Sequence, residues 1–211
     1  MQNNPIKPKI EIESSKETRE NFKRASGFLK PTILFIWSVI KIVTVSLVVI
    51  IPIRYFLIQP FIVSGPSMEP NFKDGEYLII NEISYRFVDP QRGDVIVFRY
   101  PQNPKEYYIK RIIGLPKEKV QIKNRDVIIY NDQHPAGIKI DEPYLPDDLE
   151  TPGNTETRLD ENEYFVLGDN RFSSSDSRMW GTLPRSDIIG QAWIRCFPLS
   201  RFSVFKTPEY D

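Results

Sequence analysis

The hydrophobic and polar positions divide the chain into three stretches of different character. Residues 1–30 are polar and show no apolar period, which predicts a disordered leader. From Pro31 to Val63 the chain is strongly apolar, interrupted only by Lys41 and Arg54. Its segment Ile33–Ile53 has about the 20 residues that a helix needs to cross a bilayer core. We therefore expect a transmembrane helix over residues 31–55.

A buried core helix and a cleavable signal peptide are the alternatives for this apolar stretch. A core helix so long and so unmixed does not suit a domain of this size. A signal peptide fits poorly as well, because the apolar run is too long and no small-x-small cleavage site follows it. The leader carries seven basic residues against four glutamates, so the N-terminus is expected in the cytoplasm and the remainder on the extracytoplasmic side. This predicts a single-pass protein of the plasma membrane or an internal membrane.

Beyond the apolar stretch, the pattern changes to short runs of Val, Ile, Tyr and Phe separated by Gly, Pro, Asn and Asp. Such runs are typical of strands, and no helical period of any length follows residue 60, so residues 56–211 are expected to form a mainly β domain. Asn124-Arg125-Asp126 predicts a hairpin turn, and the acidic, Pro/Gly-punctuated segment Asp141–Asn162 predicts a surface excursion. The expected strands are Tyr77–Ile80, Asp94–Tyr100, Tyr107–Ile113, Lys119–Lys123, Val127–Tyr130, Tyr164–Leu167 and Ile188–Arg195.

Composition narrows the chemistry. The 28 basic and 28 acidic residues cancel, so bulk charge gives no argument for a nucleic-acid partner. Cys196 is the only cysteine, which excludes an internal disulfide and a cysteine-rich metal site. His134 is the only histidine and lies in a polar run typical of an exposed turn, which argues against a Ser-His-Asp triad. We expect neither a cofactor nor a metal.

Ser67 stands in the segment Ser64-Gly65-Pro66-Ser67-Met68-Glu69-Pro70, directly after the apolar stretch. Glycine and two prolines fix a tight, irregular backbone around the serine, which suits a nucleophile held at a surface. An ordinary turn has the same composition, so this segment alone decides nothing.

Lys110 lies in a run where strand alternation places it on one face with Tyr108 and Ile112. A solvated edge lysine is the ordinary interpretation. A buried lysine would have its pKa lowered from about 10.4, because burial disfavours the ammonium form, and it could then act as a base near neutral pH. With no suitable histidine in the chain, such a lysine is the plausible partner of a catalytic serine.

A third cluster, Gly168–Gly181, concentrates hydroxyl, carboxylate and guanidinium groups. Asp176 and Arg178 are spaced to pair and brace this loop, and a hydroxyl in it could hold the lysine amine. As composition alone, it equally fits a polar surface loop.

Taken together and in this order behind an apolar span, these segments resemble the type I signal peptidases, membrane-bound Ser-Lys proteases that remove signal peptides from exported proteins. The likeness runs from about residue 30 to about residue 200. Four ordered segments carry it: Ser67-Met68-x-Pro70, Arg92–Phe98, Tyr108–Pro116, and Gly168–Arg171 with Ser174–Arg178.

The resemblance implies a role for each matching residue. Ser67 would be the acylated nucleophile and Lys110 the neutral general base. Ser174 would hydrogen-bond Lys110, while Asp176 and Arg178 would form a supporting ion pair. The implied fold is a β core shared with the repressor autoproteases, with a second, variable β region inserted at about residues 118–160.

The resemblance also implies how substrate binds. A signal peptide of a secretory preprotein would lie extended between the strand before the nucleophile and the strand of Lys110, with small side chains at the first and third positions before the cut. The expected pocket walls are Phe61, Val63, Met68, Tyr108 and Ile109.

The oxyanion hole is where the chain departs from part of the family. Some members have a serine two residues before the nucleophile, whose hydroxyl helps to stabilise the oxyanion. Gly65 stands at that position here, with Ser64 one step earlier. The Ser67 amide and Gly65 are the expected oxyanion positions.

Two other functions are alternatives to the protease. A self-cleaving repressor-type protein shares the core fold but predicts a DNA-binding module, and this chain has an apolar span in that place. A catalytically silent membrane-tethered β module would require one of the four segments to be broken, and none is. The lipid bilayer is an expected partner, with Trp193, Phe197, Phe202 and Phe205 as candidate membrane-facing residues or, equally, core residues.

Overall fold

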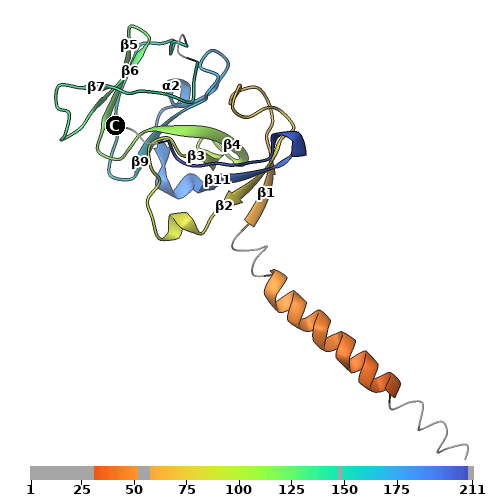
Figure 1. Ribbon diagram of the computed structural model, residues 1–211. Coiled ribbons are helices and arrows are strands. Elements are labelled where there is room, and N and C mark those ends of the chain that lie inside the picture. Colours follow the sequence, from red (N-terminus) through yellow and green to blue (C-terminus); the bar gives the residue numbers. More distant parts are fainter. Residues whose placement is uncertain (1–30, 52–57, 147–148, 209–211) are drawn as a thin grey trace, which may run out of the picture. The chain divides into compact units, whose positions relative to one another are not determined.

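The computed structural model describes residues 31–51, 58–146 and 149–208 (Figure 1). The chain separates into two compact units, residues 1–52 and residues 53–211. The expected leader over residues 1–30 and the last residues of the expected span, 52–55, lie outside the described residues.

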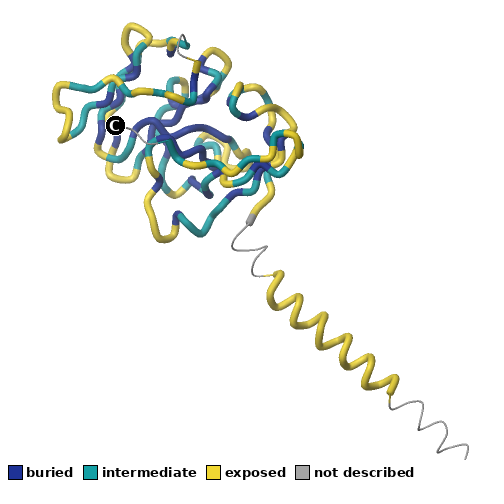
Figure 2. Tube along the Cα trace, in the orientation of Figure 1, coloured by how far each residue is buried: buried dark blue, intermediate teal, exposed yellow. Residues whose placement is uncertain are grey.

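The described part of the N-terminal unit is one helix, Pro31–Ile51, with 21 residues and a mean hydropathy of 2.6. It is long and apolar enough to cross a membrane, and it is exposed along its whole length (Figure 2). A soluble core helix would bury one face, so this exposure fits the expectation of a span better than that of a core helix.

The second unit is built from two β-sheets, which confirms the mainly β prediction. The larger sheet has eight strands in the order β1-β2-β11-β3-β4-β9-β10, with β12 paired to β11, and the smaller has four in the order β7-β6-β5-β8. The strands are β1 (Ile58–Ile62), β2 (Tyr77–Asn81), β3 (Val95–Tyr100), β4 (Asn103–Gly114), β5 (Lys119–Lys123), β6 (Asp126–Tyr130), β7 (Ile138–Lys139), β8 (Thr155–Arg158), β9 (Glu163–Leu167), β10 (Leu183–Pro184), β11 (Ile188–Phe197) and β12 (Ser203–Val204). The short helical turns are η1 (Ser84–Arg86), α2 (Ser177–Trp180), η2 (Arg185–Asp187) and η3 (Leu199–Arg201).

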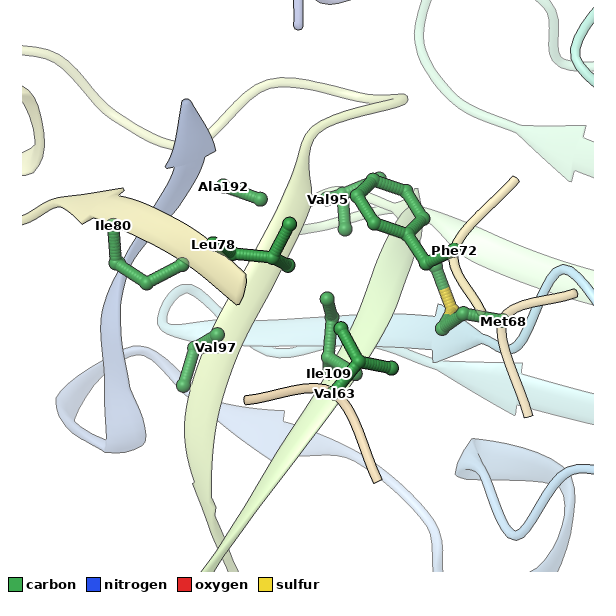
Figure 3. Close-up of a cluster of buried hydrophobic side chains, with 9 residues drawn as sticks. All are labelled: Val63, Met68, Phe72, Leu78, Ile80, Val95, Val97, Ile109 and Ala192. Carbon is green, nitrogen blue, oxygen red and sulfur yellow. The ribbon is translucent and has the colours of Figure 1, made fainter. Parts of the chain in front are cut away.

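Alternating side chains of β3 show how the larger sheet is covered on both faces. Val95 and Val97 enter one apolar cluster, while Ile96 and Phe98 enter another. A strand buried on both faces reads as a continuous apolar run, which is why β3 was recognisable in the sequence. Figure 3 shows the first of these clusters, which also takes side chains from β2, β4 and β11 and from the segment between β1 and β2.

The smaller sheet begins with the predicted hairpin. Asn124 and Arg125 have φ angles of 52° and 69°, the left-handed conformation that a two-residue hairpin turn requires at both positions. The register pairs Lys123 with Asp126 on either side of it. All four strands of this sheet fall within the segment 118–160 that was expected as an insertion.

The prediction of a surface excursion over residues 141–162 is wrong in part. Thr155–Arg158 forms β8 and pairs with β5, and Leu145, Thr151 and Leu159 are buried. The signal was weak because each apolar residue stands alone among acidic residues and prolines, so no period of two is visible in the sequence.

Candidate functional site

Ser67 is held by a loop between β1 and β2 whose far side is anchored in the core. Met68 and Phe72, next to the serine and five residues on, are 0% and 1% exposed and lie in the cluster of Figure 3. The amide of Phe72 donates to the Met68 carbonyl at 2.9 Å. Gly65 has a φ of +83°, which lets the chain turn sharply just before the serine. The serine is therefore fixed between a glycine turn and two buried side chains.

Lys110 projects from β4 and reaches the serine. Its Nζ donates to Ser67 Oγ at 2.8 Å and to the carbonyl of Ile109 at 2.8 Å. The lysine is only 3% exposed. Burial disfavours the ammonium and lowers the Lys110 pKa to about 8, against an opposing effect of the carboxylates of Asp176 and Asp169. The structure thus brings together the two residues that the sequence singled out, and it leaves roughly a tenth of the amine neutral at pH 7.

The loop after β9 packs against the backbone on either side of the Ser67 carbonyl. The Asn170 amide donates to the Ser67 carbonyl at 3.1 Å, and its side-chain Nδ2 donates to the Pro66 carbonyl at 3.1 Å. A Cβ on Gly168 would lie 2.4 Å from the Ser67 carbonyl oxygen and 2.2 Å from Ser174 Oγ. Only a glycine fits at this approach. Residues 168–170 therefore fix the backbone that carries Ser67.

Asp176 and Arg178 form the ion pair that the sequence suggested. Arg178 donates through Nε and Nη2 to the two carboxylate oxygens of Asp176, both at 2.8 Å. Asp176 is fully buried and also accepts the Gly168 amide at 3.1 Å. The pair consequently connects the short helix α2 to the glycine that approaches Ser67.

Ser174 does not make the expected hydrogen bond to Lys110. Its Oγ is buried and has no hydrogen-bond partner among the residues that the structure describes. The hydroxyl packs against Gly168, at the place where a Cβ would otherwise stand. The amine instead uses the Ile109 carbonyl of its own strand.

The expected oxyanion position at Gly65 is not supported by its hydrogen bonding. The Gly65 amide donates to the Asp74 carboxylate at 2.8 Å, so this donor is already occupied. The Ser67 amide donates to no acceptor in the described part of the chain. Of the two expected positions, only the Ser67 amide has an N–H available to an oxyanion.

A cavity of about 420 Å³ opens beside the two residues. Four of the five expected pocket residues line it, namely Phe61, Val63, Tyr108 and Ile109. Met68, the fifth, is not part of the lining, because it is fully buried in the apolar cluster below. Met68 is a core anchor of the serine loop and not a pocket wall.

The cavity lies between two strand edges that are open. β1 is the last strand of the larger sheet. β9 pairs with β4 only from Arg111 onward, so within the described residues no strand covers the outer edge of β4 before Lys110. Exposed backbone edges of this kind accept an extended peptide by strand addition.

Sequence reasoning missed a buried ion pair behind the lysine. Arg111 donates to Asp169 through Nε at 2.8 Å and Nη2 at 2.7 Å, and both side chains are almost fully buried. Asn71 Nδ2 donates to the same carboxylate at 2.9 Å. These contacts join β4, the serine loop and the loop after β9. Strand alternation placed Arg111 on the face opposite Lys110. A buried arginine on that face needs a carboxylate partner, and this requirement was the signal that could have predicted the pair.

Arg171 makes a second connection that the sequence did not reveal. It is 1% exposed and donates to Glu142, Thr151 and the Gly168 carbonyl. The segment that was expected to be a surface excursion is therefore tied to the loop behind Ser67. The site is supported from both sheets.

Comparison with known proteins identifies the family. The sequence profile described as "Signal peptidase, peptidase S26" matches residues 36–197. The chain belongs to the S26 signal peptidases. It is 36% identical over 177 residues to the probable signal peptidase I-1 of Synechocystis sp., which covers 80% of this chain and 86% of that protein. It is 32% identical over 178 residues to signal peptidase IB of Staphylococcus aureus strain MRSA252, which covers 79% of this chain and 92% of that protein.

Among solved structures, this S26 signal peptidase is similar to a signal peptidase I from Enterococcus faecalis V583. The two share 29% sequence identity with a TM-score of 0.41, and the match covers 49% of this chain and 97% of that chain. The family is one of serine peptidases, which agrees with the enzyme class expected from the sequence.

Proposed function

We propose that this signal peptidase is a membrane-anchored endopeptidase that cleaves signal peptides from exported preproteins through a Ser67–Lys110 pair. The names of the relatives support the substrate class. The 2.8 Å contact between Lys110 Nζ and Ser67 Oγ, with the lysine 3% exposed, carries the mechanistic part of the proposal.

The reaction begins with the neutral form of Lys110. One N–H of the amine donates to the Ile109 carbonyl, which directs the amine relative to Ser67. The Ser67 hydroxyl then donates to the lone pair of Nζ, and Nζ takes the proton as Oγ attacks the scissile carbonyl carbon. The Ser67 amide donates to the oxyanion.

Collapse of the tetrahedral intermediate completes the first half. The carbonyl re-forms, the peptide C–N bond breaks, and Lys110 returns its proton to the departing amine, leaving an ester on Ser67 Oγ. In the second half, Lys110 takes a proton from a water molecule that attacks the ester. The released Ser67 oxygen recovers that proton, and the carboxyl product leaves.

The substrate lies extended between the open edges of β1 and β4, where backbone pairing provides affinity. The apolar side chains of Phe61, Val63 and Ile109 enclose the space next to Ser67. Small side chains at the first and third positions before the cut fit this space, because alternate residues of an extended peptide point to the same side.

The apolar helix Pro31–Ile51 anchors the enzyme in the membrane with its N-terminus in the cytoplasm. Its exposure and composition support a retained span, and the seven basic residues of the leader support the orientation. The catalytic unit is then on the extracytoplasmic side, where a translocated signal peptide is cut.

The test is cleavage of a purified preprotein by the full-length protein and two variants, Ser67→Ala and Lys110→Ala. Both are expected to lose activity by at least about a thousandfold, as does removal of a member of a nucleophile–base unit in other serine hydrolases. Matched controls are Ser173→Ala, an exposed serine of the loop after β9, and Lys105→Ala, an exposed lysine on β4. Full activity of either site variant, with folding verified by circular dichroism, would refute the assigned pair.

A further inference from the structure

Another hollow, of about 260 Å³, shares no lining residue with the catalytic cavity, and three arginines line it. Arg86 comes from η1, Arg99 from β3 and Arg185 from η2, and the only acidic residue of the lining is Glu82. Arg185 already donates to the Tyr85 carbonyl. Arginines from separate elements that line one hollow are suited to a phosphate group, which a guanidinium can meet with paired N–H donors.

The strand register places this hollow, here called the arginine cleft, at the end of the sheet where β1 begins. Ile58 pairs with Asn81 of β2, Asn81 with Gln191 of β11, and Gln191 with Ile96 of β3. Beyond this row β2 runs on to η1, and β3 runs on to Arg99. η2 precedes the start of β11 on the same side. Figure 1 shows η1 as the turn that follows the end of β2.

The same end is tied to the apolar helix by a short piece of chain. Six residues separate Ile51 from Ile58, and a connection of that length extends by at most about 25 Å. If the helix spans the bilayer as proposed above, the end of the sheet that carries the arginine cleft is held near the membrane surface.

An exposed apolar tip stands beside the cleft. Phe87 and Val88 follow Arg86 directly and are 82% and 58% exposed. Arg86 and Arg99 are exposed as well. Basic groups next to exposed apolar side chains are the combination that binds the interface of a membrane with anionic lipids.

From these observations we infer that the arginine cleft binds the phosphate of an anionic phospholipid headgroup while Phe87 and Val88 enter the lipid interface. This docks the catalytic unit on the bilayer at the end from which the span emerges. The inference rests on the proposed membrane anchoring but not on the Ser67–Lys110 chemistry.

Glu82 reduces the affinity of the cleft and provides an internal test. Its carboxylate interacts with the charges of Arg86 and Arg99, and its Oε1 is buried without a hydrogen-bond partner in the described part of the chain. A headgroup phosphate is repelled by this carboxylate, so removing its charge should strengthen docking.

The experiment uses the full chain in vesicles, with a fluorescent bimane label as the reporter. Cys196→Ser removes the only native thiol, and Val88→Cys places the label at the tip. Lipids with brominated acyl chains quench the label when it enters the interface. We expect quenching in vesicles of mixed phosphatidylglycerol and phosphatidylcholine, and little in phosphatidylcholine alone.

Charge variants identify the site. Replacing Arg86 and Arg99 together by Gln should lower the ratio of docked to undocked protein roughly 25-fold, because each basic residue near an anionic surface contributes about fivefold. Glu82→Gln should raise the ratio about fivefold. The matched control replaces Lys123 and Arg125 by Gln, which removes the same charge from exposed residues of the β5–β6 hairpin and should change little.

Three results would overturn the inference. The first is equal quenching in phosphatidylcholine alone, and the second is an equal loss in the control pair, which would indicate general charge attraction. The third is binding of inorganic phosphate to the protein in phosphatidylcholine vesicles that Arg86→Gln with Arg99→Gln abolishes, which would assign the cleft to free phosphate. Peptide cleavage in detergent, measured on the same variants, reports separately on the catalytic proposal.

Discussion

Lys110 combines two properties that oppose one another in a folded protein. An ammonium group at 3% exposure has lost its water, and the carboxylates of Asp176 and Asp169 only partly replace that hydration. The free energy lost on burial is what gives the amine its neutral fraction near pH 8. The neutral amine that the proposed mechanism needs and the reduced stability of the fold therefore have one cause.

This common cause predicts how stability depends on pH. In the unfolded chain lysine has a pKa near 10.4, whereas in the folded protein the Lys110 pKa is about 8. Between these values the unfolded state binds the extra proton, so this group makes the free energy of unfolding rise with pH, by roughly 3 kcal/mol in total. Lys110→Met lacks the group and should lack this rise.

The measurement is urea unfolding of the full-length protein and of Lys110→Met in detergent from pH 7 to pH 10. The variant also lacks the hydrogen bonds to Ser67 and Ile109, but their absence shifts its stability equally at every pH, so the difference between the two curves isolates the titration. Above pH 8 the free energy of unfolding of the wild type should increase steadily relative to that of the variant. Lys105→Met, at an exposed position of the same strand, should follow wild type. A difference that stays constant with pH would show that Lys110 has an ordinary pKa.

At the scale of elements, the loop after β9 acts on both members of the proposed catalytic pair. It fixes the Ser67 backbone through Asn170 and Gly168, and its Asp176 carboxylate lies close enough to raise the Lys110 pKa. Arg178 neutralises much of that carboxylate. The Asp176–Arg178 pair consequently holds the loop in place, and Arg178 limits how much the Asp176 carboxylate raises the Lys110 pKa.

Asp176→Asn separates these two effects. Without the carboxylate the Lys110 pKa should fall further, because one charge that stabilises the ammonium is gone and Arg178 is left uncompensated. The acid limb of the pH profile of kcat/KM should move to lower pH. The variant should also be about 3 kcal/mol less stable, since breaking one partner of a buried pair leaves the other without compensation.

The pH profile is measured with a peptide substrate, and stability by urea unfolding. Glu156→Gln removes an exposed carboxylate from β8 on the other sheet and should leave the acid limb in place. A limb that moves to higher pH in Asp176→Asn, or that does not move, would mean that this carboxylate does not influence the amine.

The elements also show what the sequence could and could not predict. The strands with continuous or alternating apolar residues were recognisable, as was the hairpin turn at Asn124 and Arg125. Ser67 and Lys110, which the structure brings into contact, were singled out because no other base was available and the surrounding segments occur in a fixed order. Local composition was thus enough to predict an element whose conformation is set by the residues within it.

The outcomes that local composition could not decide depend on contacts made by individual groups. Met68 reads as a pocket wall from its place beside the serine, but its side chain packs in the cluster formed with β2, β3 and β4. The Gly65 position was expected to serve the oxyanion because the sequence does not show that its amide donates to Asp74. Phe205, which was expected either at the membrane face or in the core, packs against the core, with its ring centroid 4.6 Å from that of Phe72. The sequence alone does not show which partner a group has.

At the scale of the whole molecule, function depends on which side of the membrane the catalytic unit occupies. A signal peptide presents its cleavage site after translocation, so a catalytic unit in the cytoplasm could not act on it. The proposed topology follows from the charge of the leader, since the short flank before a span determines orientation more than the long segment after it. Nothing in the described part of the β domain fixes this choice, so the orientation of the span needs a direct test.

Cysteine labelling in intact cells provides that test, because Cys196 is the only native thiol and Cys196→Ser removes it. In this background, Lys123→Cys places a thiol on the exposed end of β5, and Ser14→Cys places one in the leader. A membrane-impermeant maleimide added to cells whose outer layers have been removed should label position 123 at once, and position 14 only after permeabilisation. The inverse pattern would place the catalytic unit in the cytoplasm and exclude a role in signal-peptide removal, and labelling at both positions would show a mixed topology. Replacing the basic residues Lys23, Arg24 and Lys30 by Gln should make the labelling mixed, because orientation then loses its main charge signal.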